Sequence, residues 1–522
     1  MRCLFPLVIG IVLSGASILS AAISDPVRTE TGLVSGIPGS TDEVRIYKGI
    51  PFAAPPVGDL RWREPRPPSH WEGVRKADEF SPVCMQQQRG PAGASPAPSE
   101  DCLYLNVWTA AKSANERRPV IVWTYGGAFT GGAGSVPMYD GDALARKGAV
   151  VVTYNYRLGI FGFLAHPELT KESSHNSSGN YAMMDMATVL RWVQKNIANF
   201  GGDPKRVTID GESAGSMLVS AMVASPQGKG LFQRAIGQSG AWMGVNIGKM
   251  TTRAQAEENG QKMVQALGAA SIAEMRAKPA DELLKNSRGG FGIIVDGWYV
   301  PEDLSITYQN HKQNDVDVLV GSNHDEGTFF ARPGSGNAEQ FSGTAKRRFA
   351  DQSDAYLKLY PASSDTEAGT SQLASFRDEF GWQMREWALL QSERGKAKAY
   401  LYYFTHVPPT APGQPSRGAT HTADLAYMFS NQPPNVMWTD VDKKLADTMS
   451  TYWVNFAATG NPNGKGLPEW PVYSVKKGEQ NIVLGDSVMV GQGIDPAMLA
   501  FYDSFYVKLN AGLNAGASSG SR

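Results

Sequence analysis

The chain has 522 residues, of which 42% are hydrophobic and 19% are charged, and its formal net charge is −1. This composition predicts a globular protein with a large core and excludes a disordered chain. The near-neutral charge and the scarcity of basic runs also exclude nucleic acid as an expected partner.

The first 22 residues have the pattern of a secretory signal peptide. Arg2 gives a short positive start, residues 4–19 are apolar, and Ser20-Ala21-Ala22 offers small residues for cleavage. No later segment is long and apolar enough to span a bilayer. We therefore expect cleavage near Ala22 and a secreted or periplasmic protein without a membrane anchor. The alternative is an uncleaved anchor at this end.

Export decides how the cysteines are interpreted. Cys3 lies in the predicted signal, which leaves Cys84 and Cys102 as an even pair in an oxidising compartment, so a disulfide is expected. The segment between them is rich in Gly, Pro, Ser and Ala, and closing it contributes roughly 3 kcal/mol in the chain-entropy description. No histidine lies at ligand spacing from these cysteines, so we expect no metal site.

Strand and helix patterns alternate through the middle of the chain. Compact apolar runs typical of buried strands occupy residues 120–123, 150–154, 207–209, 316–320 and 399–404. Apolar residues from Met186 to Ile197 recur at helical spacing, in a helix expected to end near Asn199. This order predicts an α/β fold with a large, mostly parallel central sheet covered by helices on both faces. In such sheets the active residues lie at the carboxyl ends of the strands.

Two segments match G-x-S-x-G, the pattern around many nucleophilic serines. Residues 516–520 lie in a Gly-, Ala- and Ser-rich tail (511–522) that we expect to be disordered. Residues 211–215 instead follow the strand at 207–209 and precede small and apolar residues. A sharp strand-to-helix turn there lifts the Ser213 hydroxyl above the sheet and directs free backbone N–H groups toward developing negative charge. Context therefore favours Ser213, not Ser518, as the nucleophile.

A glycine-rich stretch, residues 125–129, directly follows the strand at 120–123. Small residues allow the backbone to turn its N–H groups into a site, and acyl transfer needs such donors for the oxyanion. The stretch resembles the oxyanion loop of α/β-hydrolases. An ordinary glycine turn is the alternative interpretation.

The acid and the base are sought downstream, because the chain order in this fold is serine, acid, histidine. Three of the seven histidines qualify: His324, His406 and His421. His421 follows the strand at 399–404 after a Pro- and Gly-rich loop, where a base is expected. His406 lies too close to the end of that strand and is expected to cap or pack, and His324 is expected to serve its own loop. The acids follow the strand at 316–320, as Asp325 and Glu326.

Longer motifs resemble the type B carboxylesterases, the family of cholinesterases, bile-salt-activated lipase and bacterial p-nitrobenzyl esterases. The serine signature is matched from Phe200-Gly201-Gly202 through GESAG, and residues 100–107 (EDCLYLNV) match the second signature. The similarity extends from Tyr47 to Tyr473. It implies a single α/β-hydrolase catalytic domain over residues 23–510.

The resemblance also implies roles that the residues alone leave open. It makes Glu326 rather than Asp325 the acid and His421 the base. The implied oxyanion donors are the N–H groups of Gly127, Ala128 and Ala214. It further implies the disulfide Cys84–Cys102, the structural ion pairs Arg61–Glu100 and Arg157–Asp185, and no metal or organic cofactor.

Two departures from the family bear on activity and substrate. Ala128 stands where many members have glycine, but alanine keeps the backbone donor, and bile-salt-activated lipase has a similar version. In cholinesterases the loop corresponding to residues 85–101 carries a tryptophan that holds choline, and here that loop has no aromatic residue. A cation–π site from this loop is thereby excluded, and choline esters are poor candidates. We expect the substrate pockets to include residues 295–299.

The sequence therefore predicts a secreted serine carboxylesterase that hydrolyses small-molecule esters through an acyl-enzyme on Ser213. A lipase, or a hydrolase of polymer or aromatic esters with the same triad, is the alternative. A non-catalytic adhesion module of the same fold is a third hypothesis, disfavoured because all three triad members are present.

Overall fold

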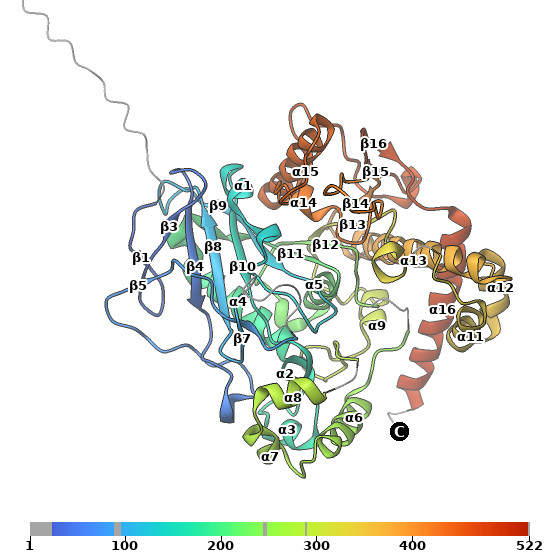
Figure 1. Cartoon of the computed structure of the whole chain (residues 1–522), viewed down its shortest axis with the longest axis horizontal. Helices are drawn as coiled ribbons and strands as arrows, with labels where there is room; N and C mark the ends of the chain where they lie inside the picture. Colours follow the sequence, from blue (N-terminus) through green and yellow to red (C-terminus); the bar gives the residue numbers. More distant parts are fainter. Residues whose placement is uncertain (1–22, 88–95, 244–247, 288–289, 333, 520–522) are drawn as a thin grey trace, which may run out of the picture.

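The computed structural model describes residues 23–87, 96–243, 248–287, 290–332 and 334–519. The predicted signal peptide lies outside this part of the chain. An 11-stranded sheet with the order β16-β15-β14-β13-β12-β11-β9-β10-β8-β4-β3 crosses the molecule, from β3 and β4 at one side to β15 and β16 at the other (Figure 1).

The strands from β10 to β15 in this order pair in parallel, whereas β8, β4, β3 and β16 are antiparallel flanks. The sheet comprises β3 (Ile37–Pro38), β4 (Arg45–Pro51), β8 (Tyr104–Thr109), β9 (Arg118–Thr124), β10 (Val150–Tyr154), β11 (Gly202–Glu212), β12 (Arg234–Gln238), β13 (Asp317–Asn323), β14 (Ala399–Phe404), β15 (Asn481–Leu484) and β16 (Val488–Gly491). Five short strands form two small sheets: β1 (Val27–Arg28), β2 (Leu33–Ser35) and β5 (Val74–Lys76), and β6 (Val83–Cys84) with β7 (Pro98–Ser99). The predicted large, mostly parallel sheet is confirmed.

Both faces of the sheet are buried under helices. Alternate residues of β9 enter two separate cores, Val120 and Val122 on one face and Ile121 and Trp123 on the other. The first core is completed by α4 (Tyr181–Asn196), α5 (Ala214–Ala224) and α13 (Asp365–Arg394), and the second by α1 (Asp142–Arg146), α14 (Leu425–Met428) and α15 (Asp440–Thr459). Burial on both faces explains why the central strands are continuous apolar runs rather than alternating ones.

The remaining helices lie around the edges of these layers. The group at the bottom of Figure 1 comprises α2 (Gly159–Phe163), α3 (Pro167–Glu172), α6 (Arg253–Ala266), α7 (Ile272–Ala277) and α8 (Ala280–Asn286). The others are α9 (Leu304–Gln309), α10 (Gly327–Phe330), α11 (Ala338–Phe349), α12 (Ser353–Leu359) and α16 (Pro496–Ser519). No helix in the described part of the chain combines the length and apolar character needed to cross a membrane.

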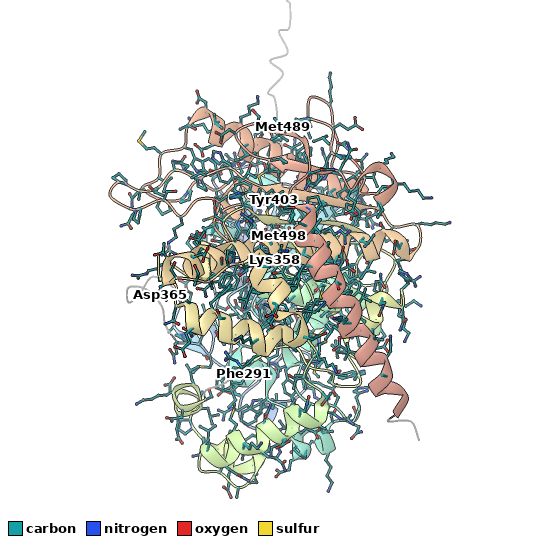
Figure 2. The ribbon with its side chains drawn as sticks, turned by 90° about the vertical axis from the view of Figure 1, so that its right-hand side faces the viewer. Phe291, Lys358, Asp365, Tyr403, Met489 and Met498 are labelled. Carbon is teal, nitrogen blue, oxygen red and sulfur yellow. A yellow bond between two sulfur atoms is a disulfide. The ribbon has the colours of Figure 1, made fainter. Side chains whose placement is uncertain are left out.

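The C-terminal segment differs from the expectation of disorder from residue 511, because α16 continues as far as Ser519. Alanine has the highest helix propensity and favours propagation of a helix that is already anchored. The anchor lies in the first half of α16, where Tyr502 and Tyr506 pack against Trp382 of α13. Figure 2 shows α16 crossing this side of the molecule, with Met498 near its start and Lys358 of α12 beside it.

Candidate active site

The predicted nucleophile lies on a tight turn between β11 and α5. Ser213 has φ 54° and ψ −124°, a conformation that an L-residue adopts only under strain. Its N–H donates to the Gln238 carbonyl at 2.8 Å, which fixes the turn to the neighbouring strand β12. A Cβ on Gly215 would lie 2.0 Å from the Thr124 carbonyl oxygen, so only glycine allows α5 to approach β9 this closely. Ser213 is half-buried between the fully buried Glu212 and Ala214.

The predicted oxyanion loop lies directly against this turn. A Cβ on Gly126 would lie 2.5 Å from Glu212 Oε2 and 2.9 Å from Ser213 Cβ. Gly127, Ala128 and Phe129 all have positive φ, of 107°, 53° and 61°. The Gly127 carbonyl accepts from two N–H groups further along the loop, each at 3.1 Å, so the Ala128 N–H, which is trans to that carbonyl, points out of the turn. Holding alanine in this region costs about 1–2 kcal/mol.

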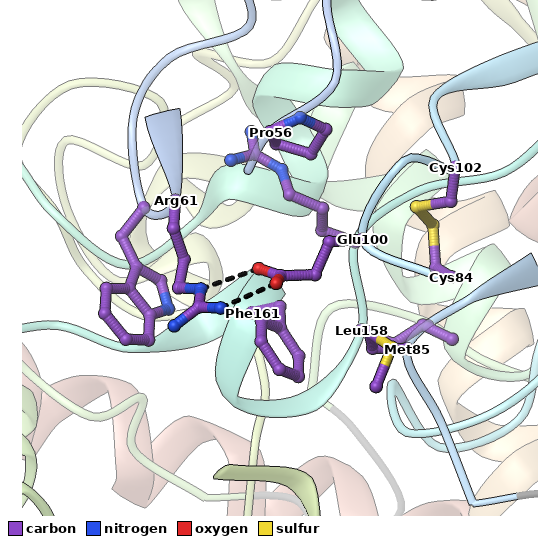
Figure 3. Close-up of a pocket in the computed structure, with 10 residues that line it drawn as sticks. Pro56, Arg61, Cys84, Met85, Glu100, Cys102, Leu158 and Phe161 are labelled. Carbon is purple, nitrogen blue, oxygen red and sulfur yellow. Dashed lines mark hydrogen bonds and ion pairs between the residues drawn. A yellow bond between two sulfur atoms is a disulfide. The ribbon is translucent and has the colours of Figure 1, made fainter. Parts of the chain in front are cut away.

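The segment that contains the predicted disulfide supports the oxyanion loop from behind. Cys84 and Cys102 are joined with an S–S distance of 2.05 Å, as predicted (Figure 3). Gln86 follows Cys84 closely, and its side-chain amide accepts from the Gly132 N–H at 2.9 Å and donates to the Gly132 carbonyl at 2.8 Å. The disulfide therefore holds a residue that fixes the far end of the glycine-rich loop.

The predicted acid lies in a turn that follows β13. Glu326 is fully buried. One of its carboxylate oxygens accepts from Ser239 Oγ at 2.6 Å and from the Asn323 N–H at 2.8 Å. The other accepts a hydrogen bond from Nδ1 of His421. Hydrogen bonds from three donors to its two oxygens therefore fix the orientation of the Glu326 carboxylate.

The predicted base, His421, is also buried, with 1% of its surface exposed. Its second ring nitrogen, Nε2, lies 3.2 Å from Oε1 of Glu212, the residue before Ser213. Burial alone would lower the pKa of His421, but the Glu326 and Glu212 carboxylates overcome this and raise it above the ordinary histidine value. Burial raises the pKa of Glu212 in turn, and the nearby imidazole opposes that rise.

Three phenylalanines surround the imidazole of His421. Phe330, Phe380 and Phe329 have ring centroids 4.9, 5.0 and 5.3 Å from it. Phe329 and Phe330 are 49% and 40% exposed, which is high for large apolar side chains next to a buried histidine. They give the base an apolar, solvent-facing rim.

Sequence reasoning missed a layer of buried polar groups beneath these residues. Asp424 accepts from Tyr402 Oη at 2.7 Å, from Gln238 Nε2 at 2.8 Å and from Asn323 Nδ2 at 3.1 Å. Asp210 is fully buried on β11, and burial raises its pKa well above the ordinary value, with the Asp424 carboxylate adding to that rise. The signal in the sequence is the acidic pair within the apolar strand, TIDGE.

The other two candidate histidines have the structural roles expected of them. His406 is buried, with Nδ1 2.6 Å from Asp486 and Nε2 2.8 Å from Asp442. His324 Nδ1 lies 2.9 Å from Oδ1 of the next residue, Asp325.

That the substrate pockets include the region of residues 295–299 stays a prediction. Trp298 stacks on His175 at 3.7 Å. The preceding segment is the part that approaches the oxyanion loop, because a Cβ on Gly292 would lie 3.7 Å from the Phe129 ring.

The two expected structural ion pairs are present. Arg157 and Asp185 lie 2.8 Å apart in full burial. Arg61 and Glu100 lie 2.6 Å apart (Figure 3). Within the residues that the structure describes, no group of three or more His, Cys, Asp or Glu side chains is arranged to hold a metal ion.

The three predicted residues follow strands of the same parallel part of the sheet: Ser213 follows β11, and Glu326 and His421 follow the adjacent strands β13 and β14, with β12 between β11 and β13. Each follows the carboxyl end of a parallel strand, with the serine on a strained strand-to-helix turn. This arrangement defines an α/β-hydrolase fold.

Comparison with known proteins identifies the family. The carboxylesterase family model matches residues 24–501. The chain is 38% identical to the fumonisin B1 esterase of Sphingopyxis macrogoltabida, over 91% of this chain and 90% of that protein. It is 33% identical to the para-nitrobenzyl esterase of Bacillus subtilis (strain 168), over 89% and 95% of the two chains.

Solved structures agree with this assignment. A PNB esterase structure aligns with a TM-score of 0.79 and 33% identity, covering 92% of this chain and 99% of that one. A carboxylesterase of Geobacillus stearothermophilus aligns with the same TM-score and 31% identity, over 92% and 99% of the chains. The chain belongs to the carboxylesterase family, and it is a carboxylic ester hydrolase.

Proposed function

We propose that the protein hydrolyses carboxylic esters with Ser213 as nucleophile, His421 as general base and acid, and Glu326 as the acid that orients the imidazole. The observation that carries this proposal is the hydrogen bond between buried Glu326 and His421 Nδ1, which leaves Nε2 on the other side of the ring, 3.2 Å from Oε1 of Glu212, the residue before Ser213. A carboxylate on Nδ1 holds the imidazole in the tautomer whose Nε2 accepts a proton.

The reaction proceeds in two halves. His421 takes the Ser213 proton as the oxygen attacks the ester carbonyl, and the N–H groups of Gly127, Ala128 and Ala214 hold the oxyanion, each donor contributing roughly 3 kcal/mol in comparable enzymes. His421 then gives that proton to the leaving alcohol, and an acyl-enzyme remains on Ser213. Water, deprotonated by His421, attacks the acyl group and releases the acid and the free serine.

We propose esters of small to medium size with apolar or aromatic parts as the substrate class. The exposed Phe329 and Phe330 beside His421 support this, because they offer apolar surface where a substrate meets the base. The named substrates of the two relatives, fumonisin B1 and a para-nitrobenzyl ester, differ from one another, so the alcohol part of the ester must be varied in one panel and the acyl part in another. A series of p-nitrophenyl esters tests the class: preference for long acyl chains and for emulsions would favour a lipase instead.

The experiment that tests the triad is Ser213→Ala, with Ser518→Ala from the second G-x-S-x-G sequence as the matched control. We expect Ser213→Ala to lose ester hydrolysis and labelling by a phosphonate probe, with its circular dichroism spectrum unchanged. Ser518→Ala should keep both activities. Hydrolysis by Ser213→Ala, or probe attached to another residue, would contradict the assignment.

We also propose that the protein is exported, with removal of residues near 1–22. The disulfide Cys84–Cys102 supports export, because such bonds persist in oxidising compartments. Sequencing the N-terminus of protein recovered outside the cytoplasm tests this, and an intact Met1 would contradict it.

A further inference from the structure

The loop that delivers His421 has little regular structure of its own. It runs from the end of β14 at Phe404 to the base, and residues 405–420 contain four prolines and no helix or strand. A catalytic base on such a loop needs an external anchor, since a misplacement of about 1 Å can reduce the rate roughly 100-fold.

Asp325 contacts this loop from the turn that carries Glu326. Its backbone N–H donates to the Ala419 carbonyl at 2.9 Å, and its carboxylate oxygen Oδ2 accepts from the Ala419 N–H at 2.8 Å. Asp325 also forms an isolated parallel bridge with Thr420. One residue therefore binds both polar groups of the residue two positions before the base.

The loop is shaped to accept this carboxylate. Gly418 has φ +70°, and a Cβ on it would lie 2.2 Å from Asp325 Oδ2. Only glycine combines that backbone conformation with space for the oxygen. The contact is thus a close fit of carboxylate to main chain rather than a surface hydrogen bond.

The second carboxylate oxygen is held separately. His324 Nδ1 lies 2.9 Å from Asp325 Oδ1, and the His324 N–H donates to the Phe404 carbonyl at 2.8 Å. The hydrogen bond with His324 holds the pKa of Asp325 below the ordinary aspartate value. The carboxylate consequently stays ionised, as an acceptor for the Ala419 N–H, at every pH at which a histidine base works.

We infer that Asp325 is a positioning residue. Its carboxylate links the turn that carries Glu326 to the loop that carries His421, and so holds the acid and the base in place relative to one another. The inference rests on the proposed roles of Glu326 and His421. Two neighbours of Asp325 support the same connection: Asn323 Nδ2 donates to the Thr420 carbonyl at 2.8 Å, and Thr328 Oγ1 donates to the Arg417 carbonyl at 2.7 Å. Asn323 Nδ2 also donates to the His421 carbonyl at 3.1 Å, and Asp325 lies between Asn323 and Thr328 and binds both backbone groups of Ala419.

The test is Asp325→Asn, which keeps the size of the side chain but leaves one acceptor oxygen where the carboxylate offers two. We expect kcat to fall by about 10- to 100-fold with KM little changed, because the base shifts while the pocket does not. Hydrogen–deuterium exchange of the peptide containing Ala419 should accelerate. Asp351→Asn is the matched control, since it removes the ion pair with Lys508 at 3.0 Å from an exposed surface, and neither readout should move.

His324→Ala is the second variant, because His324 is 48% exposed and its removal does not threaten folding. It should also lower kcat, by a smaller factor than Asp325→Asn does. The kcat of the double variant should be no lower than that of Asp325→Asn alone. Wild-type kcat together with unchanged exchange at Ala419 would overturn the inference. If Ser213→Ala were to remain active, the proposed function would fail, and the exchange experiment would still decide whether Asp325 anchors the loop.

Discussion

Two acidic side chains contact the imidazole of His421, and they do so on opposite ring nitrogens. Glu326 binds Nδ1 and Glu212 lies beside Nε2. In the proposed mechanism the first carboxylate orients the imidazole, whereas the second places negative charge where the proton from Ser213 would arrive. Glu212 thereby stabilises the protonated imidazole and makes it a weaker acid.

Glu212→Gln removes that charge and keeps the shape. The pKa of His421 should fall, because Glu212 is one of the three carboxylates that raise it, with Glu326 and Asp424. Since the base works only when deprotonated, the rising limb of kcat/KM against pH should move to lower pH. A limb that stays in place, or that moves upward, would show that Glu212 does not set the ionisation of the base.

Glu326→Gln should be far more damaging. Ser239 and the Asn323 N–H both donate to one oxygen of Glu326, so the amide oxygen of glutamine takes that place and its NH₂ faces His421 Nδ1. The proton is then forced onto Nε2, and we expect kcat to fall by about 10⁴-fold with the fold intact. Steady-state kinetics on the purified variant measure this, and combination with Ser213→Ala should add nothing.

The sequence predicts the site residues that lie in long motifs. It does not predict the residues whose contacts are made between segments far apart in the chain. Ser213 and His421 could be placed from chain order and from the strands before them. Asp424 and Ser239 could not, because their contacts with Asn323 and Glu326 arise from the adjacency of β12, β13 and β14. No local pattern records that adjacency.

Among the elements, the approach of α5 to β9 sets the position of Ser213, the proposed nucleophile. Gly215→Ala should therefore be destabilising by about 1–3 kcal/mol or more, because its Cβ meets the Thr124 carbonyl oxygen at 2.0 Å and the backbone must move. Activity should fall with stability, since Ser213 lies on the same turn. Urea denaturation and kcat/KM measure the two effects.

Gly343→Ala is the matched control for that substitution. Gly343 lies within α11, and the nearest atom to its added Cβ is the end of the flexible Arg347 side chain, at 3.5 Å. It should stabilise the protein by about 0.5–1 kcal/mol through helix propensity and leave activity alone. Equal losses of stability in Gly215→Ala and Gly343→Ala would contradict the explanation by close packing of α5 on β9.

Element types were easier to predict than element boundaries. The strand at 399–404 matches β14, but β11 begins at Gly202, before the predicted 207, through a segment that contains Pro204. Pairing of β11 with β9 shifts between Gly202 and Val207, and such an irregularity accommodates residues that normally end a strand. Tertiary packing also contributes to α16, because the contacts of Tyr502 and Tyr506 with Trp382 anchor its first half, from which the helix continues to Ser519.

Over the whole molecule, Arg61 links three distant parts of the chain. Its guanidinium donates to both carboxylate oxygens of Glu100 (Figure 3). It also donates to the carbonyls of Met275, Arg276 and Lys278 at the end of α7. The side chains of Arg61 and Glu100 are 6% and 12% exposed. Water therefore has little access to replace these hydrogen bonds when the Arg61 guanidinium is removed.

Arg61→Leu should lower the free energy of unfolding by about 3–5 kcal/mol, because Glu100 and the carbonyls lose their buried donor. Lys195→Leu is the control: its ion pair with Glu30 also connects distant residues, at 2.7 Å, but Lys195 is 60% exposed, and its loss should stay within about 1 kcal/mol. Equilibrium urea unfolding compares the two. A similar small loss for both would show that the Arg61 network contributes no more than a surface pair.

The order in which the sheet is filled has a consequence for the nascent chain. The strand that carries Ser213 is synthesised long before β14, and Glu326 and His421 are separated by 95 residues. At about 5–20 residues per second, roughly 5–20 seconds pass on the ribosome between these two residues alone. During that time the serine turn has been synthesised without its proposed partners, so in the proposed mechanism a chain truncated before His421 should not hydrolyse esters. If that mechanism holds, ester hydrolysis requires that synthesis has continued past β14 to His421.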